Sequence, residues 1–189
     1  MTGDVVTILG LSGSLRRASF NAGLLRAAVA AAPAGTTVAI HDLGDVPFLN
    51  EDLEPDAIGP AVDALRDAIA DADALLLASP EYNGGYTPVL KNAIDWASRP
   101  VRESALTNQT VSVIGASNGQ FGAMWAQTDL RKVLGITGAR VVGDELPVAR
   151  AFEKFDSEGR LLDGELVERL GLVLGTLAFE AAGSARVAA

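Results

Sequence analysis

The chain contains no cysteine and a single histidine, His41. It therefore has no disulfide bond, no catalytic thiolate and no metal site built from cysteines or several histidines. Lysine and arginine number 15 against 24 acidic residues, and the formal net charge is −9. Such an acidic chain is not expected to bind nucleic acid, which requires a basic surface. His41 ends a predicted strand and is interpreted as structural, and no metal ligand is predicted.

Long hydrophobic runs are also missing, because Asp, Arg or Gly interrupts each apolar stretch within a few residues. The first residues lack the basic and apolar regions of a signal peptide. We therefore expect a cytoplasmic protein without membrane contacts. Apolar residues are nevertheless abundant, at 49% of 189 residues. This content is sufficient for a substantial core and predicts a single domain over residues 1–189.

Strand and helix patterns alternate along the chain. Strands are predicted from Val5 and over 37–41, 74–78, 110–115 and 139–142. Helices are predicted over 22–32, 60–72 and 88–97, in a segment that includes Met124 and Leu134, and within 161–182. This alternation predicts an α/β fold, a three-layer sandwich with a five-stranded parallel sheet and helices on both faces. Five strands fit the doubly wound order 2-1-3-4-5, in which the loops after strands one, three and four converge.

Two segments suggest contacts beyond the core. Residues 42–59 form a long predicted loop, and loops of this length are usually functional or face a partner. The helix over 88–97 is predicted to be capped by Thr87, with Pro88 in its first position. Its apolar surface, which includes Trp96, is wider than one stripe. The helix is therefore either deeply buried or faces a second subunit, and we favour the second interpretation.

The loop after the first strand is rich in small polar and basic residues. It contains Ser14, Ser19 and Asn21 together with Arg16 and Arg17, and it opens a helix. The amides and positive dipole of a helix N-terminus attract anions, and hydroxyls and a guanidinium strengthen such a site. This pattern predicts a phosphate-bearing cofactor. The alternative is that the serines and the asparagine only cap the helix.

The loops after strands three and four could hold the rest of a mononucleotide. They comprise Pro80, Glu81, Tyr82, Asn83 and Gly84, and Ser117, Asn118 and Gly119. A Walker loop, a G-x-G-x-x-G fingerprint, a phosphatase cysteine and a receiver-domain aspartate at the end of strand three are all missing. Backbone amides of the second loop could bind the pyrimidine end of a flavin. Alternatively, that loop is only a connecting turn.

These motifs resemble those of the NADPH-dependent FMN reductase family, the flavodoxin-like quinone, azo and chromate reductases. Residues 13–21 are similar to the family's G-S-x-R-x-x-S-x-N, and residues 80–83 match P-E-Y-N. Where family members often have a glycine pair, this chain has Gly122 and Ala123. The resemblance runs from Val5 to about residue 182 and implies a flavodoxin-like fold.

The resemblance also implies the residues that bind the cofactor. The FMN phosphate would be held by Ser14, Arg16, Ser19 and Asn21. The isoalloxazine ring and ribityl chain would be bordered by Pro80, Glu81, Tyr82, Asn83, Gly84, Ser117, Asn118 and Gly119.

By the same resemblance, the chain would be a homodimeric or homotetrameric enzyme in which NADPH or NADH reduces bound FMN. The flavin would then reduce a quinone, another flavin, an azo compound or chromate. Because the cofactor performs the chemistry, no catalytic acid or base is assigned, and Glu81 is interpreted as structural. Two alternatives are a flavodoxin-type electron carrier and a flavin-free regulatory protein on the same fold.

Overall fold

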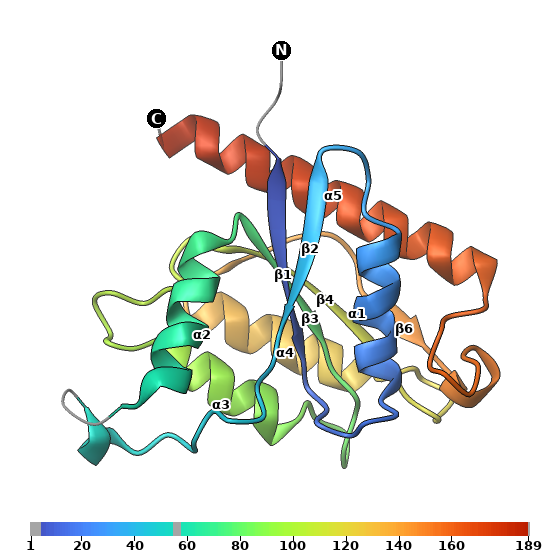
Figure 1. Cartoon of the computed structure of the whole chain (residues 1–189), viewed down its shortest axis with the longest axis horizontal. Helices are drawn as coiled ribbons and strands as arrows, with labels where there is room; N and C mark the ends of the chain where they lie inside the picture. Colours follow the sequence, from blue (N-terminus) through green and yellow to red (C-terminus); the bar gives the residue numbers. More distant parts are fainter. Residues whose placement is uncertain (1–4, 55–57, 189) are drawn as a thin grey trace.

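Parallel strands form one central sheet between two layers of helices (Figure 1). The computed structural model describes residues 5–54 and 58–188, with side chains through residue 184. In chain order the elements are β1 (Val6–Ser12), α1 (Phe20–Ala30), β2 (Thr36–His41), η1 (Glu51–Leu53), α2 (Pro60–Asp71), β3 (Ala74–Ala78), α3 (Pro88–Ala97), β4 (Thr110–Ala116), α4 (Met124–Ile136), β5 (Arg140–Val141), β6 (Leu146–Val148), η2 (Ala151–Glu153) and α5 (Gly164–Ala188). None of the helices in the described ranges has both the length and the hydropathy needed to cross a bilayer.

The sheet has the strand order β2-β1-β3-β4-β5, and every pair in it is parallel. This confirms the predicted order 2-1-3-4-5. A sixth strand, β6, was not predicted. It follows β5 in the sequence, and both strands pair with β4. β5 pairs with Thr110 and Val111 of β4, whereas β6 pairs with residues 114–116. The three residues of β6, with a central proline, are too short for a periodic pattern.

Helices cover both faces of the sheet, as predicted. One apolar core packs α1 and α5 against the sheet, and the other packs α2, α3 and α4 against the opposite face. β3 contributes to both cores, since Leu76 belongs to the first and Leu75 and Leu77 to the second. All five residues of β3 are buried, which explains its continuous apolar sequence.

The start of α1 and the end of α5 differ from the prediction. α1 begins at Phe20 rather than residue 22, since the Ser19 hydroxyl accepts a hydrogen bond from the Ala22 amide at 3.3 Å. α5 begins at Gly164, inside the predicted range 161–182, and extends beyond residue 182. The carboxylate of Asp163 accepts from the Leu166 amide there, at 3.1 Å.

The apolar face of α3 is buried within the chain, so the preferred interpretation that it faces a second subunit is wrong. Trp96 is completely buried, and its indole Nε1 donates to the Pro47 carbonyl at 2.7 Å. The Asn92 amide donates to the same carbonyl and accepts from the Leu49 amide. The segment after β2 is thereby fixed across α3. Residues 55–57 of the loop predicted over 42–59 lie outside the described residues.

Thr87 occupies the predicted cap position of α3, but its side chain makes no capping hydrogen bond. Its hydroxyl is buried and has no hydrogen-bond partner among the described residues. A Cβ on Gly13 would lie 2.7 Å from this hydroxyl and 2.9 Å from Leu90 Cδ1. Glycine at 13 therefore allows the loop after β1 to pack directly against the start of α3.

Replacing Thr87 by valine should stabilise the protein, because it removes an unsatisfied buried hydroxyl while keeping a branched side chain of similar shape. We expect a gain of about 1 kcal/mol in the free energy of unfolding, measured by urea denaturation. Thr137→Val is the matched control. The Thr137 hydroxyl donates to the Leu134 carbonyl at 2.8 Å, so this change should destabilise the protein. A loss of stability in Thr87→Val would contradict the assignment of an unsatisfied hydroxyl.

Candidate functional site

The carboxyl ends of β1, β3 and β4 lie at the same edge of the sheet, the lower edge in Figure 1, where Ser12 pairs with Ala78 and Ala78 with Ile114. The loops that follow these strands surround a cavity of about 560 Å³. Its lining consists of Ser14, Arg16, Ser19, Phe20, Asn21, Pro80, Glu81, Tyr82, Ala116, Ser117, Asn118 and Gly119. The structure thus brings together all the predicted site residues except Asn83 and Gly84.

Backbone hydrogen bonds fold the first loop into a turn ahead of α1. The Gly13 amide donates to the Ala78 carbonyl at 2.8 Å, and the Ser19 amide donates to the Arg16 carbonyl at 3.0 Å. The Ser14 hydroxyl accepts from the Arg16 amide. The Ser19 hydroxyl caps α1 as an acceptor, so the capping interpretation holds for Ser19, but its hydrogen can still be donated to a ligand. Hydroxyls and the first amides of α1 therefore adjoin the cavity.

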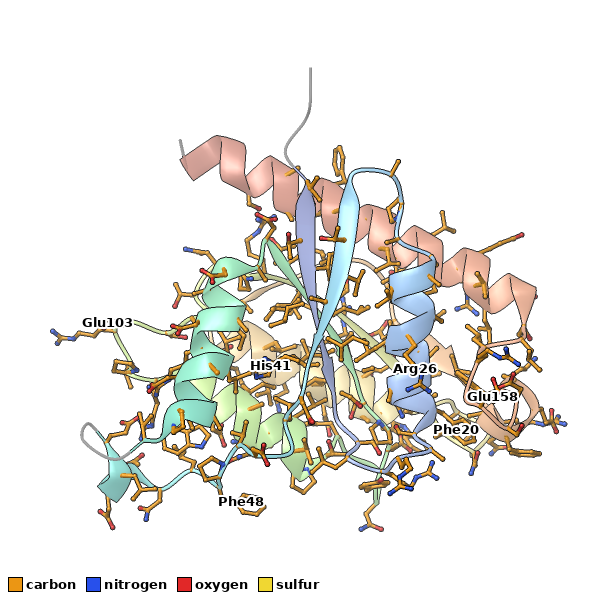
Figure 2. All side chains as sticks on the ribbon, viewed as in Figure 1. Phe20, Arg26, His41, Phe48, Glu103 and Glu158 are labelled. Carbon is orange, nitrogen blue, oxygen red and sulfur yellow. The ribbon has the colours of Figure 1, made fainter. Side chains whose placement is uncertain are left out.

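Arg16 supplies positive charge at this end of the cavity. Its side chain is exposed, and the guanidinium lies 5.8 Å from the centroid of the Phe20 ring. Figure 2 shows Phe20 at the start of α1. The ion pairs among the described residues do not include Arg16. In a chain with a net charge of −9, this guanidinium can bind an anion.

Asn21 lines the cavity, but the structure assigns its side chain a different partner from the predicted phosphate. Its amide nitrogen donates to the Ala116 carbonyl at 3.0 Å, and its amide oxygen accepts from the Ala116 amide at 2.9 Å. The residue is 2% exposed. Both ends of the amide group are therefore bonded to the last residue of β4. Asn21 holds the start of α1 against β4, and because its amide nitrogen has a second hydrogen, its contact with a phosphate stays a prediction.

The second loop forms a tight hairpin turn beyond the cavity. Tyr82 and Gly85 exchange two backbone hydrogen bonds, of 3.0 and 3.2 Å. Between them, Asn83 and Gly84 have positive φ values of 53° and 78°. Positive φ at both central positions is typical of a type I′ turn, for which Asn-Gly is the preferred pair. The connecting-turn interpretation therefore fits these two residues.

Glu81 connects the second loop to the start of α4, the helix that follows the third loop. One of its carboxylate oxygens, Oε2, accepts from the amides of Trp125 at 3.0 Å and Ala126 at 3.2 Å. These amides belong to the first turn of α4, whose own cap residue, Ala123, provides no side-chain hydrogen bond. The geometry agrees with the structural interpretation of Glu81.

The third loop is supported by β6 and the residues after it. The Ser117 amide donates to the Val148 carbonyl at 3.1 Å, and the Arg150 amide donates to the Gly119 carbonyl at 3.1 Å. The Ser117 hydroxyl accepts from the amide of Ala123. Ala123 has a φ of 62°, in the left-handed region that favours glycine.

Phe20 and Ala116 also line the cavity and were not predicted. Their apolar side chains carry none of the polar signals on which the prediction relied. For Phe20 a signal was present, since it lies between two residues of the first motif. Ala116 is the last residue of β4 and follows the predicted end of that strand.

Few titratable groups are placed for acid–base catalysis. Arg16 and Glu81 are the charged side chains in the cavity lining. Burial, followed by the charges of Asp95 and Asp129, raises the pKa of Tyr86, which therefore stays protonated at neutral pH. The described part of the chain contains no cluster of three or more His, Asp or Glu that could hold a metal ion. The lining therefore offers hydroxyls and the Arg16 guanidinium, which can bind an anion.

Comparisons with known proteins agree with this description. Residues 6–153 match the family model described as NADPH-dependent FMN reductase. The chain is 41% identical over 166 residues to an NAD(P)H-dependent FMN reductase of Pseudomonas aeruginosa, covering 87% of this chain and 89% of the relative. It is 37% identical over 180 residues to an NADPH:quinone oxidoreductase of Arabidopsis thaliana, covering 92% and 90%.

A solved structure is similar over nearly the whole chain. It is the flavoenzyme NAD(P)H:(acceptor) oxidoreductase FerB of Paracoccus denitrificans, with a TM-score of 0.86 and 31% identity. The similarity covers 95% of this chain and 98% of that protein.

Asn21→Ala should destabilise the protein strongly, because it leaves a buried amide and a buried carbonyl of Ala116 without partners. We expect a loss of about 2–5 kcal/mol in the free energy of unfolding, measured by urea denaturation without ligand. Asn118→Ala is the control. Asn118 lines the same cavity but is exposed, so its replacement should change stability by less than about 0.5 kcal/mol. Equal effects of the two variants would argue against the buried clamp.

Proposed function

The chain belongs to the NADPH-dependent FMN reductase family, and on this premise we propose that FMN binds in the cavity between the three loops and carries hydride from NAD(P)H to a quinone. As a family member, the chain is an oxidoreductase that uses NAD(P)H and FMN. One observation supports the proposed position of the flavin above all. Three loops from separate strands line one cavity, with a helix N-terminus, hydroxyls and a guanidinium among its elements.

The first loop fits the phosphate of FMN. Ser14 and Ser19 can donate hydroxyl hydrogens, and the free amides of the first turn of α1 favour an anion by both hydrogen bonding and the helix dipole. Arg16 would pair with the phosphate as a charge-assisted donor. Asn21 would contribute indirectly by holding the start of α1 against β4.

The second and third loops fit the ring and the ribityl chain. Pro80, Glu81 and Tyr82 form one part of the lining, and Ser117, Asn118 and Gly119 form another. A volume of about 560 Å³ lies within the range of roughly 300–1,000 Å³ that is common for cofactor and ligand sites. We propose that Asn83 and Gly84 shape the turn that presents Tyr82, since neither lines the cavity.

The protein would bind and orient the cofactor. When bound, FMN supplies the hydride chemistry itself. Arg16 and the hydroxyls of the first loop would fix its phosphate end. Glu81 is already hydrogen-bonded to α4, so we assign it no proton transfer. With these roles, substrate reduction requires no acid or base from the cavity lining.

We propose a quinone as the electron acceptor. Curated relatives of the chain are named NADPH:quinone oxidoreductase, among them the Arabidopsis thaliana protein with 37% identity. A planar, uncharged acceptor also suits a cavity bordered by an aromatic side chain and the backbone of a glycine. Other flavins, azo compounds and chromate are the competing acceptors.

We further propose that the chain forms a homodimer or homotetramer. Phe48 is 78% exposed, and Figure 2 shows its ring pointing away from the chain. The backbone on both sides of it is fixed by the Asn92 amide group, which bonds Pro47 and Leu49. An aromatic ring presented on a fixed backbone is suited to contact a second copy. A single domain over residues 1–189 and a cytoplasmic location also stay predictions.

The absorbance spectrum tests the proposed function. We expect purified protein reconstituted with FMN to show the flavin bands, and anaerobic NADPH or NADH to bleach them. Adding a quinone should restore the bands and support continuous NAD(P)H oxidation. Absence of direct oxidation of NAD(P)H would favour the electron carrier, and failure to take up FMN would favour the flavin-free protein.

Arg16→Ala should weaken FMN binding, because it removes the charge-assisted contact to the phosphate. We expect the dissociation constant for FMN to rise about 10- to 100-fold, measured by flavin fluorescence titration of the apoprotein. Riboflavin, which has no phosphate, should bind the variant and the parent equally. Arg17→Ala is the control, since Arg17 is exposed and does not line the cavity. Unchanged FMN affinity in Arg16→Ala would contradict the proposed phosphate contact.

A further inference from the structure

Glu81 has a contact pattern that the flavin chemistry does not require. Its side chain lines the cavity, and its Oε2 atom accepts from the amides of Trp125 and Ala126 on α4. Among the described residues, no other side-chain hydrogen bond joins the loop between β3 and α3 to the segment from Ser117 to Ala126. These two segments supply separate parts of the cavity lining. Beyond the pairing of β3 with β4, this carboxylate is therefore the side-chain contact that joins the two segments in the described part of the chain.

α4 needs an acceptor from outside its own sequence. Its N-cap residue is Ala123, which has no polar side chain and is held in the left-handed region with a φ of 62°. The first amides of a helix have no partner within the helix. Glu81 provides that partner from 44 residues earlier, and its negative charge also interacts favourably with the positive end of α4.

Two helix N-termini lie near the cavity, and the Glu81 carboxylate occupies one of them. The N-terminus of α1 begins at the first loop, and that of α4 lies at Glu81, so both are near the cavity. Each would attract an anion if left free. Because Glu81 occupies the N-terminus of α4, the anion-binding end of the cavity is limited to α1. A cofactor with one phosphate is then held in one orientation.

We propose that Glu81 is a positioning residue that fixes the second and third loops at the spacing required by the flavin ring. This inference rests on the proposed function. Since Glu81 acts on the walls and not on the phosphate, its loss weakens binding of the ring itself. FMN and riboflavin, which share the ring and the ribityl chain, are affected by the same factor.

The test measures dissociation constants of the apoprotein for FMN and for riboflavin by fluorescence titration. Glu81→Ala raises both constants by about tenfold or more, by a common factor. Glu81→Gln, which keeps an acceptor oxygen, restores most of the affinity. Arg16→Ala, in contrast, weakens only FMN. If Glu81→Ala does not fold, Glu81→Asp, one methylene shorter, takes its place and is expected to weaken both flavins.

Asp163→Ala provides the matched control. Asp163 also offers a carboxylate to a helix N-terminus, since it accepts from the Leu166 amide of α5, but it does not line the cavity. Its removal is expected to lower the melting temperature and leave both dissociation constants unchanged.

Three outcomes overturn the inference. If Glu81→Ala lowers the melting temperature as Asp163→Ala does and leaves both constants unchanged, Glu81 is only a helix cap. If Glu81→Gln binds both flavins as weakly as Glu81→Ala, the hydrogen bonds to the Trp125 and Ala126 amides do not set the loop spacing, and the inference fails. If the parent protein binds neither flavin, the proposed function fails, and this result is recognised before any variant is measured.

Discussion

The two hydrogen bonds between the Asn21 side chain and the backbone of Ala116 hold the site together at its centre. Both groups are buried, so each must be satisfied within the protein. The clamp joins the start of α1, after the first loop, to the end of β4, before the third. Glu81 joins the second loop to the start of α4, and the close packing of Gly13 on Leu90 joins the first loop to α3. Each of these contacts joins a loop, or the element next to it, to another part of the site without involving a ligand.

Much of the fold could be predicted because each strand of the sheet has its own local hydrophobic pattern in the sequence. The continuous apolar segment 74–78 identified a buried central strand, and its neighbours followed from the alternation of elements. The segment that packs on the apolar face of α3 could not be predicted in this way. An apolar face shows that something packs on it, but the partner of Trp96 is a carbonyl at Pro47, 49 residues away. Periodicity carries no information about such a distant partner.

The location of the site was predictable, but the contacts of several residues were not. Small polar residues after three strands indicated where a ligand would lie, and most of them line one cavity. Their hydrogen-bond partners depend on packing between distant segments. Asn21 was assigned to a phosphate and also binds the backbone of Ala116, and Asn83, assigned to the ring, forms a turn outside the cavity lining. A motif thus identifies residue type and place, whereas the fold determines which atoms are left for a ligand.

One edge of the sheet is formed by two short strands, β5 and β6, in place of one long strand. This arrangement has a consequence for self-association. An exposed edge strand offers unpaired amides and carbonyls on which another chain can add a strand, the first step of many forms of aggregation. Here that edge consists of one segment of two residues and one of three, the latter with Pro147 at its centre. Proline has no amide hydrogen to donate, and strands this short offer an incoming strand few backbone groups for hydrogen bonding. This border of the molecule is therefore protected against uncontrolled growth of the sheet.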